Sequence, residues 1–177
     1  NWMGPCRNKG EDARLYEAVE AASSFAIQLG INIPTGKDSL SMKQKSPEGG
    51  DVIAPGTVII SAAAHCTDVK KVVEPVFQRN GGNIYYINLS SDEYLLGGSA
   101  FAQILNRVGT EAPTVKDAKA FKKAFNALQT LIAQGKIQAG HDISSGGLIT
   151  TLLEMCFADN ELGATLDLTP LSADEDI

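Results

Sequence analysis

The sequence predicts an α/β fold that begins with an α+β part, and three observations lead to this class. Apolar residues recur with helical period over residues 11–30, short strand-like apolar runs follow them, and strands alternate with helices through the second half. Such alternation is typical of a layered sheet with helices packed on it. With 177 residues, 44% of them hydrophobic, the chain can bury one core or two small ones.

The first half is expected to contain one long helix. Apolar side chains three or four positions apart from Glu11 onward predict an amphipathic helix that Gly30 ends, because glycine readily adopts the left-handed conformation of a helix end. Pro75 limits the length of any helix in the segment before the turn "QRNGG". The elements expected here are a helix over 11–30, a strand over 31–34, a polar loop over 35–55 with a turn at 49–51, a buried strand over 57–65, and a short helix or extended connector over 67–76.

The second half is expected to alternate strands and helices after a domain boundary near that turn. Phe121, Phe125, Leu128 and Ile132 form one stripe and predict the longest helix of this half. A separate helix is expected over 97–109, and the small residues at the start of "GGSAFAQIL" would let its first turn approach a neighbour closely. The expected elements are strands over 83–89, 136–142 and 163–168 and helices over 97–109, 116–134 and 147–158.

Composition excludes several classes of function. The formal net charge of −6 and the scattered lysines argue against a nucleic-acid partner, and an anion would have to be bound by local donors or a metal ion. The absence of any apolar stretch of about 20 residues argues against a membrane span, and no secretory leader opens the sequence. Three widely spaced cysteines predict neither a zinc site nor a disulfide framework, so we expect a reducing cytoplasmic location.

The stretch "PTGKDS" does not match a phosphate-binding loop. That pattern requires glycine where Ile31 stands and a hydroxyl where Asp38 stands. Lys37 and Ser39 could line a polar pocket, or they could belong to an exposed loop of ordinary turn residues.

The stretch "GHDISSGGL" offers a candidate metal ligand. Asp142 is expected at the end of a strand, at the edge where open α/β sheets bind ligands. Mg²⁺ prefers oxygen ligands and commonly uses one or two carboxylates together with phosphate oxygens. Asp142 could therefore supply part of a magnesium site, with a nucleotide supplying the rest.

The residues that follow Asp142 have two interpretations. Ser144 and Ser145 offer hydroxyls, and Gly146 and Gly147 expose amides at the start of a helix, where an anion is favoured. Alternatively, Ser144 or Asp142 caps the helix and the glycines only permit the turn. Beside this stretch, His141 is expected to be a hydrogen-bonded structural residue.

Several stretches, taken in order and spacing, resemble one enzyme family across nearly the whole chain. This family is the large phosphoribosylformylglycinamidine synthases, of the aminoimidazole-ribonucleotide-synthetase-like superfamily. The stretches are "NWMGPC", "GEDARLYEAVEAAS", "LGINIPTGKDSLSM", "PGTVIISAAAHCTDVKKVVEP", "LGGSAFAQIL" and "HDISSGGLITTLLEMCFA".

The resemblance implies a reaction of de novo purine synthesis. The family converts formylglycinamide ribonucleotide, glutamine and ATP into formylglycinamidine ribonucleotide, glutamate, ADP and phosphate, with Mg²⁺ as cofactor. ATP is thought to activate the substrate's amide oxygen as a phosphate ester, which ammonia from a glutaminase domain then displaces. One of the two pseudo-symmetric nucleotide sites is catalytic, and the other can hold ADP structurally.

The resemblance also implies domains and site residues. Residues 1–68 would finish an N-terminal α+β domain of synthetase type, and residues 69–177 would begin a C-terminal mixed-sheet α/β domain. The family's magnesium aspartate corresponds to Asp142, and its nucleotide-contacting serine corresponds to Ser144. Many relatives have a basic residue and a second acid where this chain has Ile143 and Ser145. Catalytic residues, and the roles of Lys37 and Ser39, are not implied.

The chain is expected to be an internal fragment without synthetase activity of its own. Its partners would be the rest of the synthetase core and the glutaminase domain, and either nucleotide site could be the one that Asp142 serves. Two alternatives stay open. One is another ATP-using enzyme of the superfamily, such as a thiamine-phosphate kinase or a selenophosphate synthetase, and the other is a catalytically silent structural module that binds nucleotide.

Overall fold

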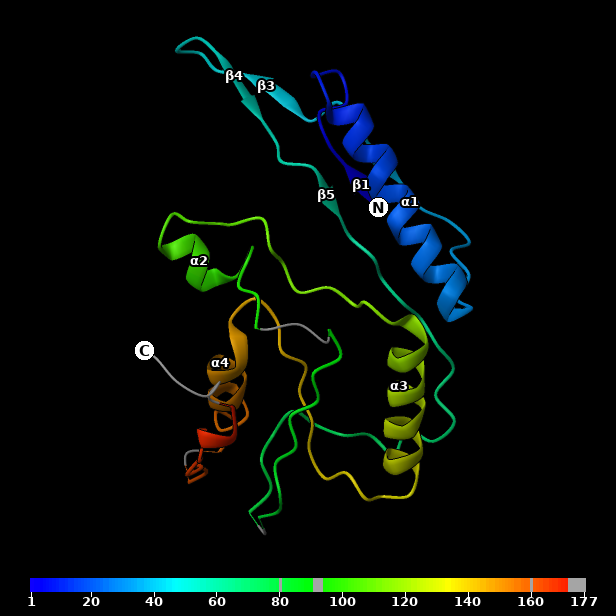
Figure 1. Cartoon of the computed structure of the whole chain (residues 1–177), viewed down its shortest axis with the longest axis vertical. Coiled ribbons are helices and arrows are strands. Elements are labelled where there is room, and N and C mark those ends of the chain that lie inside the picture. The colour runs from blue at the N-terminus through cyan, green and yellow to red at the C-terminus, as the bar shows by residue number, and fades with distance from the viewer. Residues whose placement is uncertain (80, 91–93, 160, 172–177) are drawn as a thin grey trace. The chain divides into compact units, whose positions relative to one another are not determined.

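A computed structural model of the chain describes residues 1–79, 81–90, 94–159 and 161–171. It combines helices with small sheets, which confirms the mixed α+β content (Figure 1). Two compact units are distinguished, the first formed by Asn1–Thr67 with Ala118–Lys122 and the second by Asp68–Asp117 with Lys123–Ile177. The expected domains, 1–68 and 69–177, and their synthetase-like arrangement stay predictions.

The sheet of the first unit unites three stretches that are far apart in the sequence. Its strands are β1 (Trp2–Met3), β2 (Asp38–Ser39) and β5 (Thr57–Val58). Strand β1 lies in the centre, parallel to β2 and antiparallel to β5, with Trp2 opposite Asp38 on one side and Val58 on the other. The backbone N–H of Gly4 donates to Ser39 O at 2.9 Å beyond the strand end. "NWMGPC" and "GKDSLSM" therefore form one ladder.

A hairpin occupies much of the segment expected to be a polar loop. It pairs β3 (Lys43–Lys45) with β4 (Asp51–Ile53) in antiparallel register, and an ion pair of 2.6 Å joins Lys43 Nζ to Asp51 Oδ2. Gly49 and Gly50 have φ values of 92° and 94°, which glycine adopts without steric cost. The predicted turn is confirmed, whereas the prediction that 35–55 is entirely loop is wrong.

Helix α1 (Glu11–Leu29) follows its predicted bounds. Glu11 and Asp12 place negative charge in its first turn, where the helix dipole favours it. Gly30 adopts φ 74° and donates to Ile27 O, while the next amide donates to Ala26 O, which together form a Schellman motif. No residue of α1 is buried.

Helix α3 (Ala118–Ala133) is also confirmed, within the predicted 116–134. Its first turn belongs to the first unit and contacts the end of α1 there. Lys122 Nζ donates to Leu29 O at 2.6 Å, so a cation lies at the negative end of the α1 dipole. The rings of Phe25 and Phe121 meet edge to face with centroids 6.0 Å apart.

The second unit contains α2 (Ala100–Ile104), α4 (Gly147–Glu154) and the 3₁₀ turn Thr169–Leu171. Its buried apolar residues are Ala102 on α2, Leu152 on α4 and Met155 directly after α4. Helix α2 is shorter than the predicted 97–109, because Asn106 adopts φ 53° and ends the helical path. Helix α4 begins where predicted but ends at Glu154 rather than at residue 158.

The strand predictions for the second unit are not confirmed. Residues 83–89, 136–142 and 163–168 run outside any ladder, apart from one isolated parallel bridge between Glu74 and Ala139. In the first unit, no strand forms over 31–34, and the nearest strand is β2. Of the run 57–65, only Thr57–Val58 forms a strand, and Ile59 extends the pairing by exchanging two backbone hydrogen bonds with Asn1. A strand needs a hydrogen-bonding partner, and an apolar run specifies none. The segment 67–76 contains no helix, and the Lys71 N–H donates to Asp68 O at 3.1 Å in a turn at its start.

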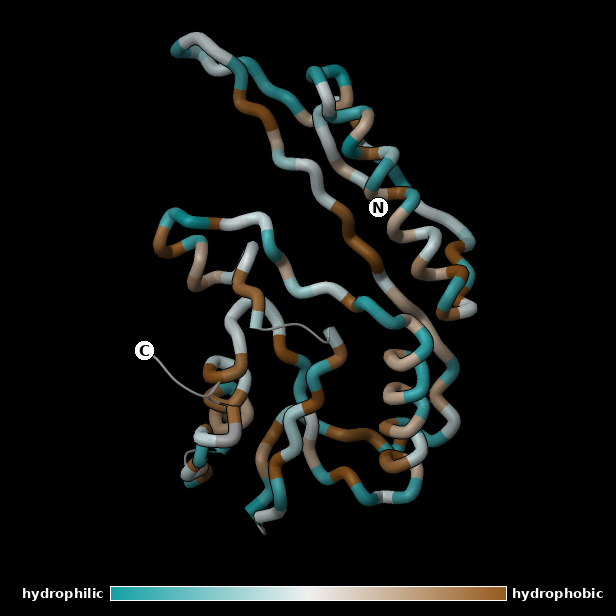
Figure 2. The backbone as a smooth tube through the Cα atoms, in the orientation of Figure 1, coloured by the Kyte–Doolittle hydropathy of each residue, from teal (hydrophilic) through white to brown (hydrophobic). Residues whose placement is uncertain are grey.

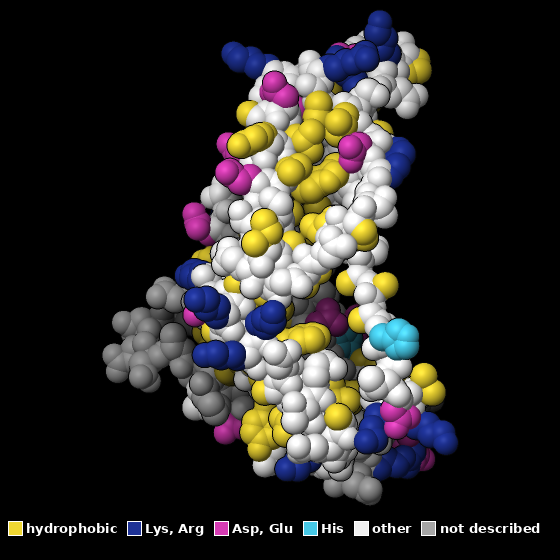
Figure 3. Space-filling view, turned by 90° about the vertical axis from the view of Figure 1, so that its right-hand side faces the viewer, with side chains coloured by type: hydrophobic (Ala, Val, Ile, Leu, Met, Phe, Trp, Pro, Cys, Tyr) yellow, Lys and Arg dark blue, Asp and Glu magenta, His cyan; other side chains and the backbone are white. Residues whose placement is uncertain are grey.

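Apolar segments are accordingly exposed in both units. Figure 2 shows hydrophobic stretches along extended parts of the tube, and Figure 3 shows hydrophobic side chains at the surface of one face. Exposed large side chains include Ile27, Ile60, Tyr85, Ile104 and Phe157. Extensive apolar surface is typical of a chain that packs against other protein surfaces. Among the described helices, none combines the length and the apolar character that a membrane span requires.

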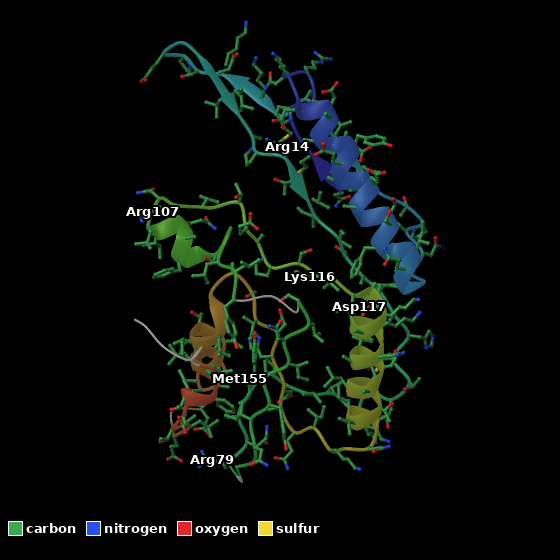
Figure 4. The ribbon with its side chains drawn as sticks, in the orientation of Figure 1. Arg14, Arg79, Arg107, Lys116, Asp117 and Met155 are labelled. Atoms are coloured by element: carbon green, nitrogen blue, oxygen red, sulfur yellow. The ribbon has the colours of Figure 1, made fainter. Side chains whose placement is uncertain are left out.

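An ion-pair cluster joins two segments of the second unit. Arg79, labelled at the lower end of Figure 4, donates from Nε to Asp159 Oδ2 at 3.1 Å and from Nη1 to Glu161 Oε2 at 2.7 Å. The Glu161 backbone N–H and the Arg79 guanidinium lower the pKa of Asp159. Hydrogen bonds from Arg79 to Glu161 and Asp159 raise the pKa of the arginine.

We expect this cluster to be released in acid. Because the pKa of folded Asp159 is lowered, its stabilising contribution is complete above the ordinary aspartate pKa and disappears as pH falls through the folded value. A carboxyl NMR titration of Asp159 in the intact protein should show a midpoint below the ordinary range. In Arg79→Gln the midpoint should rise only part of the way, since the Glu161 N–H bond remains. An unchanged midpoint in that variant would contradict the role of Arg79.

Candidate magnesium and nucleotide site

A turn of two glycines connects an extended segment to helix α4. The Gly147 N–H donates to Ser144 O at 3.0 Å, and Gly147 adopts φ 80°. At Gly146, a Cβ atom would lie 2.8 Å from Thr150 Cγ2, so a larger residue would collide with the first turn of the helix. The turn therefore favours glycine at both positions, at Gly146 because space is limited and at Gly147 because φ is positive.

The carboxylate and the carbonyl of Asp142 have different surroundings. The side chain is 93% exposed. The carbonyl oxygen instead faces protein groups, with His141 Nδ1 at 2.7 Å and Thr151 Oγ1 at 3.5 Å. The backbone of Asp142 is thus held against the unit while its carboxylate remains available to a ligand.

The start of α4 is not capped by a side chain. Gly146 is the N-cap residue and supplies no side-chain acceptor. Among the described residues, no hydrogen bond to the hydroxyls of Ser144 or Ser145 is found. The capping interpretation of Ser144 and Asp142 is therefore not the arrangement observed, and the hydroxyls remain available.

His141 has the structural environment expected of it. Its side chain is 21% exposed, and its two ring nitrogens face oxygen atoms. Nδ1 lies 2.7 Å from Asp142 O, and Nε2 lies 3.5 Å from Glu154 Oε2 on α4. These contacts link the residue before the turn to the end of the helix that follows it.

A neighbouring helix also contacts the turn, and sequence reasoning missed its partner. The Ala100 N–H at the start of α2 donates to Ser145 O at 2.8 Å. Ser99 caps α2 by accepting from Ala102 N at 3.1 Å. The small residues of "LGGSAF" predicted a close approach, but nothing in the sequence identified what they approach.

The other candidate residues belong to a different unit from Asp142. Lys37 and Ser39 belong to the first unit, where Lys37 Nζ donates to Ser39 Oγ. Two open hollows of about 360 and 370 Å³ lie in the second unit, and Asp142 lines neither of them. Within the described ranges, no group of three His, Cys, Asp or Glu side chains could hold a metal ion. Asp142 therefore offers a single, open carboxylate.

Together, these features define a two-part α+β chain whose second unit presents a glycine-rich turn, an exposed carboxylate and an uncapped helix. Residues 1–65 match the FGAR-AT PurM_N-like domain, and residues 83–177 match the AIR synthase related protein, C-terminal domain. The chain belongs to the family of AIR synthase related proteins. The resemblance inferred from the sequence motifs is thereby confirmed.

A curated relative gives a closer comparison. The chain is 43% identical over 170 residues to a protein of Arabidopsis thaliana named probable phosphoribosylformylglycinamidine synthase, chloroplastic/mitochondrial. The match covers 95% of this chain and 12% of that protein. The chain thus spans about an eighth of the length of this relative.

Proposed function

We propose that the chain is part of an ATP- and glutamine-dependent ligase of de novo purine biosynthesis that converts formylglycinamide ribonucleotide into formylglycinamidine ribonucleotide. The observation that supports this most is the 43% identity, over almost the whole chain, to a relative with this enzyme's name. The matches of both parts of the chain to families of this superfamily agree with it. The partners would be the remaining synthetase core and a glutaminase domain, in the cytoplasm, although the plant relative is named for organelles.

Asp142 is proposed to be a magnesium ligand and Ser144 a nucleotide contact. The donor chemistry fits, because a carboxylate supplies the hard oxygen that Mg²⁺ prefers, and this one is exposed. A single carboxylate suffices only if phosphate oxygens, waters or other parts of the protein complete the coordination. When bound, the ion would neutralise phosphate charge in a chain whose own net charge is −6.

The turn and helix would hold the phosphates themselves. Ser144 offers an unpaired hydroxyl close to the amides that begin α4, and the helix dipole favours an anion there. ATP would be the substrate at a catalytic site, or ADP would remain bound at a structural one.

Activity of the intact protein tests the proposed reaction. With Mg²⁺, ATP, glutamine and formylglycinamide ribonucleotide, it should release ADP, phosphate and glutamate together with the amidine product. The isolated 177-residue chain should show no turnover above buffer, because its described residues contain no group of three side chains that could hold a metal ion. Glutamine turnover by the isolated chain would contradict its proposed inactivity. Phosphorylation of thiamine phosphate or synthesis of selenophosphate by the intact protein would support another enzyme of the superfamily.

A further inference from the structure

Among the described residues, Thr151 is the one polar residue that is buried, with 5% of its surface exposed. It lies on α4, and its hydroxyl approaches two carbonyl oxygens, Gly147 O at 3.1 Å and Asp142 O at 3.5 Å. A threonine hydroxyl has one proton to donate, so the two acceptors share it. Because the hydroxyl is buried, its hydrogen bonds to these acceptors matter for stability, since a buried polar group without a partner is costly.

The two carbonyl groups belong to the two ends of the same turn. Asp142 precedes the turn and Gly147 begins the helix after it, so one hydroxyl joins both ends from inside the unit. The Asp142 carboxylate extends from the same residue into solvent. Rotation of the backbone at Asp142 would therefore break the contact with Thr151 and redirect the carboxylate.

The neighbouring Thr150 shows what is specific to Thr151. Its hydroxyl donates to Gly146 O at 2.8 Å, an ordinary bond to the carbonyl four residues earlier, and its side chain is exposed. Both threonines make this local bond. Only Thr151 also reaches back to Asp142.

We propose that Thr151 is a positioning residue for the magnesium–nucleotide site and acts by fixing the backbone of Asp142. This inference rests on the proposed function, since it assumes that Asp142 binds Mg²⁺. Valine at position 151 keeps the volume and apolar contacts but removes the donor, whereas serine keeps the donor.

The test uses the intact protein and titrates ADP binding against Mg²⁺ concentration. Thr151→Val should raise the Mg²⁺ concentration needed for half-maximal binding about threefold to tenfold, the effect of one lost hydrogen bond. ADP binding without metal should change less than about twofold, since the hydroxyl contacts no proposed nucleotide group. In the metal-free protein, hydrogen exchange of the Gly147 amide should become faster in Thr151→Val.

Two matched variants and one reference complete the experiment. Thr151→Ser and Thr150→Val should both stay within about twofold of the parent in Mg²⁺ dependence.

If Thr151→Val binds ADP with the same Mg²⁺ dependence as the parent while Asp142→Asn abolishes that dependence, the positioning role is wrong and the metal site stands. If Asp142→Asn itself has no effect, the metal site and the inference both fail. Equal weakening of binding with and without metal would show general loosening and also overturn the inference. If Thr151→Val does not fold, ADP binding by Thr151→Ala is titrated against Mg²⁺ instead, and the same fold-changes are expected.

Discussion

Replacing Asp142 by asparagine is expected to weaken Mg²⁺-dependent ADP binding to the intact protein by at least about tenfold. Asparagine preserves the size of the side chain and one carbonyl oxygen, but it removes the negative charge that attracts a hard cation. The side chain is 93% exposed, and the contacts that hold the turn involve the carbonyl oxygen of the residue. The variant should therefore fold like the parent. Calorimetric titration with ADP, with and without Mg²⁺, measures the loss of binding.

Asp68→Asn is the matched control for this variant. It removes the same charge from an exposed position in the second unit, where Asp68 Oδ1 accepts from the Lys70 N–H. Its ADP binding should equal that of the parent. Retained Mg²⁺-dependent binding in Asp142→Asn would show that the metal assignment is wrong. Lost binding with unchanged turnover would instead show that this nucleotide site is structural, which is the alternative of a silent module.

The helices could be predicted because their signals are local. In α1, the spacing of apolar residues and the glycine at position 30 lie within the helix or next to it, and both bounds agree with the prediction. Helix α2 ended early for an equally local reason, the left-handed conformation of Asn106, but asparagine does not require that conformation. Whether the apolar stripe of α1 is buried could not be predicted locally, because burial depends on what packs against the helix. In the structure, no residue of α1 is buried.

Strand pairing and the surroundings of the site depend on residues far apart in the sequence. Trp2 pairs with Asp38 and Val58, and no pattern within "NWM" specifies either partner. The position of Asp142 before a glycine turn could be predicted from "HDISSGG", but the prediction that it ends a strand at a sheet edge is not confirmed, since residues 136–142 form no strand. The contact between Ala100 and Ser145 could not, and neither could the hydrogen bond from Thr151 to Asp142. A threonine on the inner face of an apolar helix looks like any other small core residue until its acceptors are known.

Gly97 connects the candidate site to the remaining structure by a close backbone contact. Its N–H donates to Glu111 O at 2.8 Å, and the following Gly98 donates to Val108 O at 2.7 Å. A Cβ atom on Gly97 would lie 2.4 Å from that same Glu111 oxygen and 2.6 Å from its carbonyl carbon. Both are backbone atoms, so a rotamer change cannot relieve the collision. Either the backbone at Gly97 must move away from Glu111, or α2 must move.

Gly97→Ala should therefore destabilise the second unit by about 1–3 kcal/mol, the usual range for an overpacked position. The displacement should reach the candidate site, because α2 begins three residues later and its Ala100 N–H binds Ser145 O. Thermal unfolding of the intact protein and hydrogen exchange of the Ala100 amide measure the two effects. Gly163→Ala is the control, since open space surrounds that glycine, and its stability should change by less than about 1 kcal/mol. If Gly97→Ala matched this control in both measurements, the contact with Glu111 would not determine where α2 meets the turn.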